Sequence, residues 1–205
     1  MAKKKRKKKK GKGPRVGNLV VIAVVALATA ALGAALLIWL GERPPGTPRP
    51  TGIRSVRVYF GSPEGTYLTP ETRGIRRGDL AAEVTEAVGE LLRGPKTGLT
   101  ATIPVGTKVL AVKVRGGTAF VDLSGEVAAN HPGGSSGEIQ TVYSIVNTVT
   151  VNFTSVKNVQ ILIDGKKRKT LAGHIDISLP LGANTRFIRT RKTLESRLSP
   201  EKKRA

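Results

Sequence analysis

The sequence predicts an α+β fold: a small antiparallel or mixed sheet with two helices packed on one face, preceded by one transmembrane helix. Three observations predict it. A long uncharged apolar run lies near the N-terminus, two later segments carry apolar residues at helical spacing, and shorter segments alternate apolar and polar residues around turns. The order of strand, weak strand, helix, hairpin, helix and hairpin suits one layer of helices on one sheet.

The predicted transmembrane helix covers residues 16–41, which include no charged residue. Its apolar core runs from Leu19 to Leu40, and at about 1.5 Å per residue a helix of this length crosses a bilayer core of about 30 Å. Trp39 lies at the outer end, where an indole ring favours the headgroup layer. Leu19, Trp39 and Leu40 are therefore predicted to mark the membrane anchor.

Charges beside this span predict its orientation. Residues 1–15 contain ten Lys or Arg and no acidic residue, whereas the Pro/Gly linker at 42–52 is nearly neutral. Because basic flanks stay on the cytoplasmic side, we expect a single-pass protein of the cytoplasmic membrane, with a basic cytoplasmic head and its folded part outside. A cleaved signal peptide is the alternative, but its apolar region is about 7–15 residues, so an uncleaved signal-anchor is favoured.

The formal net charge of +21 is concentrated at the two ends of the chain. Residues 1–15 contribute +10, the basic tail at 186–205 contributes +6, and residues 53–185 contribute only +4. A Lys-rich run can bind nucleic acid, but beside a membrane span it sets topology and binds anionic lipid, so no nucleic-acid partner is expected. The tail is predicted to contact anionic lipid or a cell-wall polymer, or to stay solvated.

The first folded segments are predicted as two strands and a helix. Residues 55–61 alternate strictly between apolar and polar, which indicates a half-buried strand before a turn at 62–65. Residues 66–75 are a weaker strand, at an edge because of Pro70. Asp79 is a candidate N-cap for a helix from Leu80 to about Arg93, which Gly94-Pro95 ends.

A hairpin is predicted next, with Gly116-Gly117 as its two-residue turn. In its first strand, the face that carries Lys113 and Arg115 is expected to be the more solvent-exposed of the two faces. The residues expected to point inward are therefore Leu110, Val112 and Val114, and in the return strand one face carries Ala119, Val121 and Leu123.

Ser135 and Glu138 have the spacing of a capping box and open a second predicted helix that continues to Phe153. This segment is rich in β-branched residues, so burial must stabilise the helix, and a strand is the alternative. Asp164-Gly165 then predicts a hairpin between strands at 156–163 and 166–177.

Few residues suggest chemistry. There is no cysteine, which excludes disulfides and thiolate sites, and the two histidines are His131 and His174. His174 stands two residues before Asp176, but one such pair supplies too few ligands for a metal, and a hydrogen bond to loop backbone is the favoured role. Asp122 is expected to make a polar contact near Ser124. No catalytic residue, metal site or cofactor is therefore predicted.

Two further features suggest binding surfaces. Ser135-Ser136 between glycines lacks the Gly-Lys-Ser/Thr pattern of a phosphate loop, so capping explains it better. Spacing of Ala26, Ala30 and Ala34 allows two anchors to pack, which permits a homo-oligomer. A basic cluster is a candidate interaction surface for an anionic polymer, or else the charged guard of an edge strand: Lys166, Lys167, Arg168 and Lys169.

Three segments together carry a family resemblance. They are ELLRGPKTGL at 90–99, IPVGTKVLAVKVRGGTAFVDLSGE at 103–126, and residues 137–181 with the series VYSIVNT, DGK and LAGHID. They resemble the GerMN domain, a family named after a spore-germination and sporulation protein. The resemblance implies a single GerMN domain at 53–185, with a helix, strand, strand, helix, strand, strand order similar to ring-building motifs. It also implies an exported or membrane-anchored envelope module outside the known enzyme families.

The sequence therefore predicts a membrane-tethered, non-catalytic binding or scaffold module that assembles or regulates an envelope complex through an envelope protein partner. The alternative is an envelope hydrolase acting on peptidoglycan, which requires Asp122, His174 and Asp176 to converge in a pocket. A third reading, a cytoplasmic nucleic-acid protein, requires the opposite topology.

Overall fold

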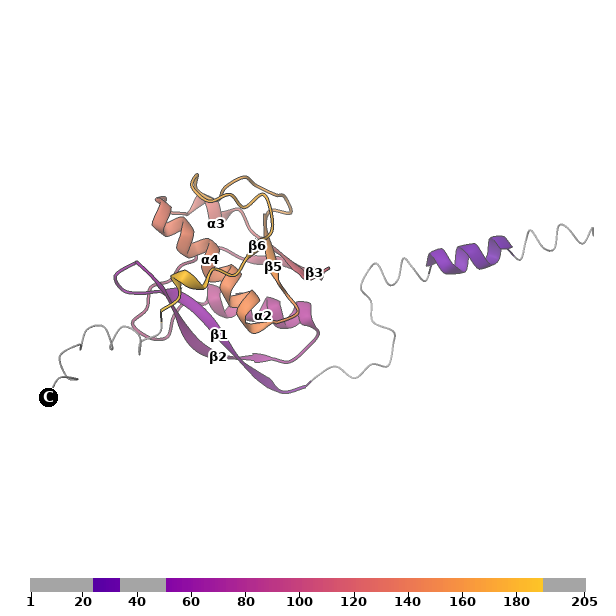
Figure 1. Cartoon of the computed structure of the whole chain (residues 1–205), viewed down its shortest axis with the longest axis horizontal. Helices are drawn as coiled ribbons and strands as arrows, with labels where there is room; N and C mark the ends of the chain where they lie inside the picture. The colour runs from indigo at the N-terminus through magenta and orange to yellow at the C-terminus, as the bar shows by residue number, and fades with distance from the viewer. Residues whose placement is uncertain (1–23, 34–50, 190–205) are drawn as a thin grey trace, which may run out of the picture. The chain divides into compact units, whose positions relative to one another are not determined.

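The computed structural model describes residues 24–33 and 51–189 (Figure 1). The chain divides into two compact units, residues 1–48 and 49–205, and the second holds the globular fold. Its elements are β1 (Ile53–Gly61), β2 (Leu68–Arg76), α2 (Leu80–Leu92), β3 (Val109–Arg115), β4 (Thr118–Leu123), α3 (Glu126–Ala129), α4 (Ser135–Asn152), β5 (Asn158–Ile163), β6 (Leu181–Gly182) and the 3-10 helix η1 (Thr185–Phe187).

Residues 24–33 form a helix with exposed side chains. Across 24–33 and 51–189, no helix combines the length and the apolar character needed to cross a bilayer. The rest of the predicted span, including Leu19, Trp39 and Leu40, lies outside the described residues. The transmembrane anchor accordingly stays a prediction.

The larger sheet has the strand order β3-β4-β5-β6. β3 and β4 are antiparallel, β4 and β5 are parallel, and β5 and β6 are antiparallel, so the sheet is mixed as predicted. A parallel pair needs a long crossover between its strands, and α4 lies in that crossover. The β3–β4 turn is made by Gly116 and Gly117, both with positive φ, which confirms the predicted hairpin.

β1 and β2 form a separate two-stranded antiparallel sheet, where one sheet was predicted. The physical reason lies at the other edge of β1, which α4 occupies. The N–H of Tyr59 donates to Thr148 Oγ1 at 3.2 Å, and the N–H of Arg57 donates to Asn152 Oδ1 at 2.9 Å. Helix side chains therefore take the hydrogen bonds that a third strand would otherwise accept.

The two long helices and the larger sheet share one core. α2 begins at Asp79, whose side chain accepts from the N–H of Ala82, as predicted. α4 is a helix throughout, which decides between the helix and strand alternatives. The core joins the inner faces of β1 and of the larger sheet to both helices, through Val58, Phe60, Val84, Val88, Val121, Leu123, Val142, Val146, Val149, Ile161 and Ile163, among others.

The predicted inward direction of Leu110 is wrong, since its side chain is 50% exposed. A register shift between Val109 and Ala111 marks a β-bulge at this point. A bulge leaves one residue out of the alternation, and Val109 packs on the core in place of Leu110.

The predicted strand after Asp164-Gly165 is also wrong. The turn forms, with φ of 50° at Asp164 and 74° at Gly165, but across it only Ile163 and Lys166 are bridged, and the later bridge between Thr170 and Asp176 lies within the segment that leaves the sheet. β5 pairs instead with β4 and the short β6. The segment after Lys166 leaves the sheet because α4 holds it elsewhere, as shown below.

The predicted capping box of Ser135 is a further error. α4 has Gly134 as its N-cap, without a side-chain cap, and Ser135 is exposed. Glu138 does not turn back to the N-cap; it is fully buried and bonds to a distant loop.

The bond between Thr148 and β1 yields a test of this architecture. Replacing Thr148 by Val keeps the shape of the side chain but leaves the buried N–H of Tyr59 without an acceptor. The free energy of unfolding should therefore fall by about 1–3 kcal/mol. The matched control is Thr150→Val, because Thr150 bonds only to Val146 O of its own helix. Denaturation of the full chain in detergent, followed by near-UV circular dichroism of the tyrosines, measures both; equal losses would contradict the assigned role of Thr148.

Candidate functional site

A groove of about 710 Å³ lies along β2. Its lining comes from the β1–β2 turn, from β2, from α2 and from the loop after α2, through Pro63, Glu64, Thr69, Pro70, Glu71, Thr72, Arg73, Gly74, Glu90, Lys96, Thr97, Gly98 and Leu99. One strand, one helix, a turn and a loop thus meet around one hollow, and its polar residues come from separate parts of the sequence.

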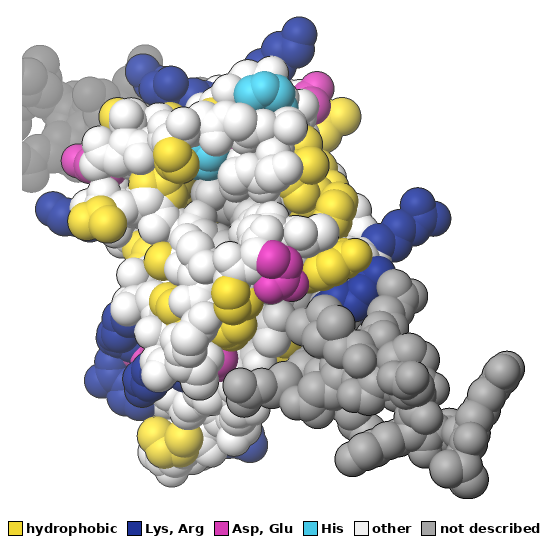
Figure 2. Space-filling model, turned by 90° about the vertical axis from the view of Figure 1, so that its left-hand side faces the viewer, with side chains coloured by type: hydrophobic (Ala, Val, Ile, Leu, Met, Phe, Trp, Pro, Cys, Tyr) yellow, Lys and Arg dark blue, Asp and Glu magenta, His cyan; other side chains and the backbone are white. Residues whose placement is uncertain are grey.

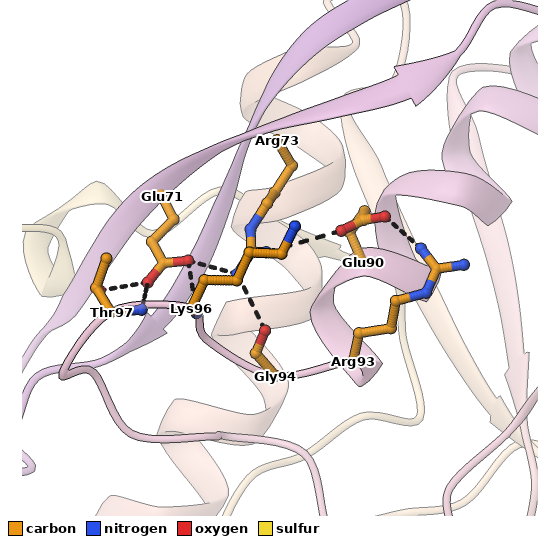
Figure 3. Close-up of polar contacts among 7 residues, drawn as sticks. All are labelled: Glu71, Arg73, Glu90, Arg93, Gly94, Lys96 and Thr97. Atoms are coloured by element: carbon orange, nitrogen blue, oxygen red, sulfur yellow. Dashed lines mark hydrogen bonds and ion pairs between the residues drawn. The ribbon is translucent and has the colours of Figure 1, made fainter.

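Arg73 lies at the floor of this groove and is only 4% exposed. Its position on β2 is directly opposite Val56 on β1, whose side chain faces the core. Its Nη2 donates to the Glu71 carboxylate and to Gly94 O, the latter at 3.0 Å (Figure 3). Its Nη1 is 4.0 Å from Glu90 Oε2, so the guanidinium lies between two carboxylates.

Three buried polar atoms at this floor have no hydrogen-bond partner among residues 24–33 and 51–189: Nε and Nη1 of Arg73, and Oγ1 of Thr69. A buried donor without an acceptor costs about 1–3 kcal/mol, and more when it is charged. These donors are sealed beneath the floor of the groove, and a shift of the lining side chains would let an oxygen atom of a bound molecule, or water, accept from them.

Glu71 fixes the loop after α2, which forms the wall of the groove across from β2. Its carboxylate accepts from the N–H of Lys96 at 3.1 Å, and from the N–H at 2.9 Å and the hydroxyl of Thr97 (Figure 3). Burial acts to raise the pKa of Glu71, but these hydrogen bonds, with the charge of Arg73, outweigh burial and lower the pKa. Glu71 is thus ionised at neutral pH and ties β2 to the loop, so the groove is preformed.

A second buried carboxylate, that of Glu138, lies in the first turn of α4. Glu138 accepts from the backbone N–H groups of Leu171 at 2.8 Å, Ala172 at 2.9 Å and His174 at 2.6 Å, and its Oε2 is 3.1 Å from His174 Nδ1. Burial acts to raise the pKa of Glu138, yet the backbone N–H donors outweigh burial and lower it. The carboxylate therefore holds the loop at 171–175 that leaves the sheet.

The residues proposed for hydrolysis occupy separate hydrogen-bond sets. Asp122 accepts from Gly165 N at 2.8 Å, His174 contacts Glu138, and Asp176 accepts from the N–H and hydroxyl of Ser178. The predicted loop-backbone role holds for Asp176, while Asp122 contacts the turn after β5 and not Ser124. Across the described ranges, no group of three His, Asp or Glu side chains that could hold a metal was found.

The other predicted positions are placed as follows. His131 Nδ1 accepts from Gly133 N at 3.0 Å, and its Nε2 is 3.1 Å from Thr141 Oγ1. Lys166, Lys167, Arg168 and Lys169 are exposed after β5, so their binding role stays a prediction. Figure 2 shows Lys and Arg side chains in several separate places on one face, with apolar side chains between them.

Sequence reasoning missed Arg73, Glu71 and Glu90, and it gave Glu138 a capping role in place of its bonds to the loop at 171–175. One signal was available for Arg73, because it alternates with Ile75 and so occupies the apolar register of its strand. A charged residue in that register must find buried partners. The partners themselves lie too far along the chain for a local pattern to indicate them.

The family model described as "Germane: Sporulation and spore germination" matches residues 57–169. The chain belongs to the Germane family. This match confirms the resemblance to the GerMN domain that the sequence suggested. The matched range includes both Arg73 and Glu138, whereas the loop at 171–175 that Glu138 holds follows it.

One of the similar solved structures, with a TM-score of 0.50, supports the fold. The first GerMN domain of the sporulation protein GerM from Bacillus subtilis is 23% identical, with a TM-score of 0.50, over 64% of this chain and 98% of that one. The tandem GerMN domains of the same protein are 24% identical, with a TM-score of 0.48, over 65% of this chain and 46% of that one. A candidate lipoprotein from Clostridium perfringens is 25% identical, with a TM-score of 0.47, over 66% and 93%. No curated protein matches the chain.

Glu138 predicts a specific pH dependence of stability. Its folded pKa is lowered, so the stability it contributes is complete above the unfolded pKa of about 4.3 and is lost as pH falls through the folded pKa. Glu138→Gln places an amide donor against the N–H of His174 and should cost about 1–3 kcal/mol at pH 7. That deficit should shrink at pH 3.

Thermal unfolding of the full chain and the variant at both pH values measures the effect, with the exposed Glu64→Gln as control. A deficit that does not change with pH would show that packing, and not charge, explains the loss.

Proposed function

We propose that this chain is a membrane-tethered, non-catalytic Germane module that binds an envelope protein partner through the groove along β2, and thereby assembles or regulates an envelope complex. The observation that carries the proposal is the set of buried donors without a hydrogen-bond acceptor at the floor of the groove, Arg73 Nε and Nη1 with Thr69 Oγ1. They supply binding energy only when an acceptor enters.

The chemistry of the groove favours recognition over hydrolysis. The guanidinium of Arg73 carries N–H donors and no acceptor, so it can hold an oxygen atom of a bound molecule by hydrogen bonds. Glu71 is ionised and committed to Lys96 and Thr97, and Glu90 pairs with Arg93. The carboxylates thus position Arg73 and the loop, which is the arrangement of a binding site.

The tether follows from the sequence of the first 52 residues. An uncharged run at 16–41 behind a head of ten basic residues supports anchoring in the cytoplasmic membrane, with the Germane domain on the outer side. The Pro/Gly linker at 42–52 then separates the domain from the bilayer surface. Anionic lipid or cell-wall polymer is the proposed ligand of the exposed cluster at 166–169 and of the tail.

Site-specific photo-cross-linking in intact cells tests the binding site. A photoreactive amino acid at Thr72, which is exposed at the groove, should give a covalent adduct of higher mass. The same group at Lys113, exposed on β3, is the matched control and should give little or none. Equal adducts from both positions, or none from Thr72, would overturn the assignment of the groove.

Topology is tested by reporters fused to the C-terminus. Alkaline phosphatase, which is active only outside the cytoplasm, should be active in the full-chain fusion and inactive when residues 16–41 are deleted. A reporter that works only in the cytoplasm should show the opposite. Activity of the cytoplasmic reporter in the full-chain fusion would refute the proposed orientation and favour the alternative of a cytoplasmic nucleic-acid-binding protein.

A further inference from the structure

The outer edge of β2 presents unpaired backbone groups to the groove. Arg57 and Tyr59 of β1 direct their N–H groups toward α4, away from β2. In an antiparallel pair the residue opposite such a position also points outward, so the backbone groups of Thr72 and Pro70 face the free edge, and alternation adds those of Gly74. Within the described part of the chain, no residue outside β1 bonds to the backbone of Thr72 or Gly74.

This edge already accepts one short piece of chain. Ile188 forms a parallel bridge with Leu68, and the N–H of Arg189 donates to Leu68 O at 2.9 Å. The guanidinium of Arg189 lies 4.5 Å from the centre of the Tyr67 ring, which adds a cation–π contact. The chain therefore reaches the start of the groove in the parallel orientation.

The bridge between Ile188 and Leu68 sets the register of any parallel strand that continues from Arg189. A chain that continues in parallel from Arg189 passes Pro70, Thr72 and Gly74 in turn, which all line the groove. After the N–H of Arg189, the N–H groups of every second residue, at positions 191, 193 and 195, fall opposite the carbonyl oxygens of these three. Pro70 has no N–H, so the donors that β2 offers in return are those of Thr72 and Gly74.

The residues that follow Arg189 suit the groove in charge and in hydrogen-bonding groups. The sequence from Thr190 to the C-terminus contains six Lys or Arg and two Glu. Three carboxylates and two cations, Arg73 and Lys96, line the groove, and the carboxylate of Glu64 has no ion-pair partner in the described part. In the parallel register Thr193 takes the position next to Arg73, and its hydroxyl oxygen is the kind of acceptor that the buried guanidinium lacks.

We propose that the free edge of β2 is a strand-accepting groove whose occupant is the chain's own C-terminal segment from Thr190, which continues the parallel pairing begun at Ile188. The inference concerns the same groove as the proposed function and adds its regulation. A covalently attached segment has an effective concentration of about millimolar, so a partner must displace it to bind.

Amide hydrogen exchange with residue-level mass spectrometry tests the proposal on the purified full chain in detergent. The amides of Thr72 and Gly74 should exchange roughly tenfold or more slowly in the full chain than in a chain that ends at Arg189, since pairing protects them. Amides of α2 and α4 should not change, which controls for unfolding. Equal exchange of Thr72 and Gly74 in the two chains would overturn the proposal.

Two synthetic peptides of residues 190–205, added to the chain that ends at Arg189, test the register. N-methylation at Arg191 and Thr193 removes N–H groups that face β2, and that peptide should not restore protection. N-methylation at Lys192 and Leu194 leaves those groups intact, and that peptide should restore it. Equal protection by both would show attraction by charge without strand addition and would contradict the proposal.

A dilution series distinguishes pairing within one chain from pairing between two copies of the chain. Protection should not depend on chain concentration, and a loss of protection on dilution would overturn the intramolecular assignment. The purified chain contains no partner, so this result is independent of cross-linking at Thr72 in cells. If both proposals hold, the chain that ends at Arg189 should give more of the cross-linked adduct than the full chain.

Discussion

The structure depends on five polar side chains of α4 that bond to the backbone of segments outside this helix. Glu138 holds the loop at 171–175, Thr141 Oγ1 donates to Thr102 O, and Thr148 accepts from Tyr59 N. Asn147 exchanges two bonds with the backbone of Asn184, and Asn152 does the same with Arg57. A single buried helix thus satisfies backbone groups that would otherwise be unpaired in the interior.

This arrangement explains why α4 is helical despite its β-branched residues. Its intrinsic helix propensity is low, and the side chains that lower it are the ones that pack or bond on every side. Arg54 adds a further link between layers, because it donates to Glu83 of α2 and to Asn152 O at the end of α4. Tertiary contacts therefore stabilise the helix.

The groove along β2 is a consequence of the same constraint. Because α4 bonds to one edge of β1 at Arg57 and Tyr59, the two-stranded sheet extends on that side only by the bridge between Gly61 and Thr100, while in the described part of the chain most of the edge of β2 stays open. Arg73 and Glu71 then rigidify the loop after α2 across from that edge. The packing of α4 against β1 thus leaves a polar groove along the free edge of β2.

Local chemistry determined much of this fold from the sequence alone. Alternation placed β1, Asp79 marked the start of α2, Gly116-Gly117 set the β3–β4 turn, and the family resemblance came from contiguous segments. These signals depend on neighbours within a few residues. Only the tertiary structure decided the direction of Leu110, the path after Lys166 and the roles of Arg73 and Glu138. Glu138 bonds to residues 33 to 36 positions away, and the Arg73 guanidinium bonds a carbonyl 21 positions away. A buried charge is tolerable only where such distant donors and acceptors converge, and no local pattern specifies which ones will.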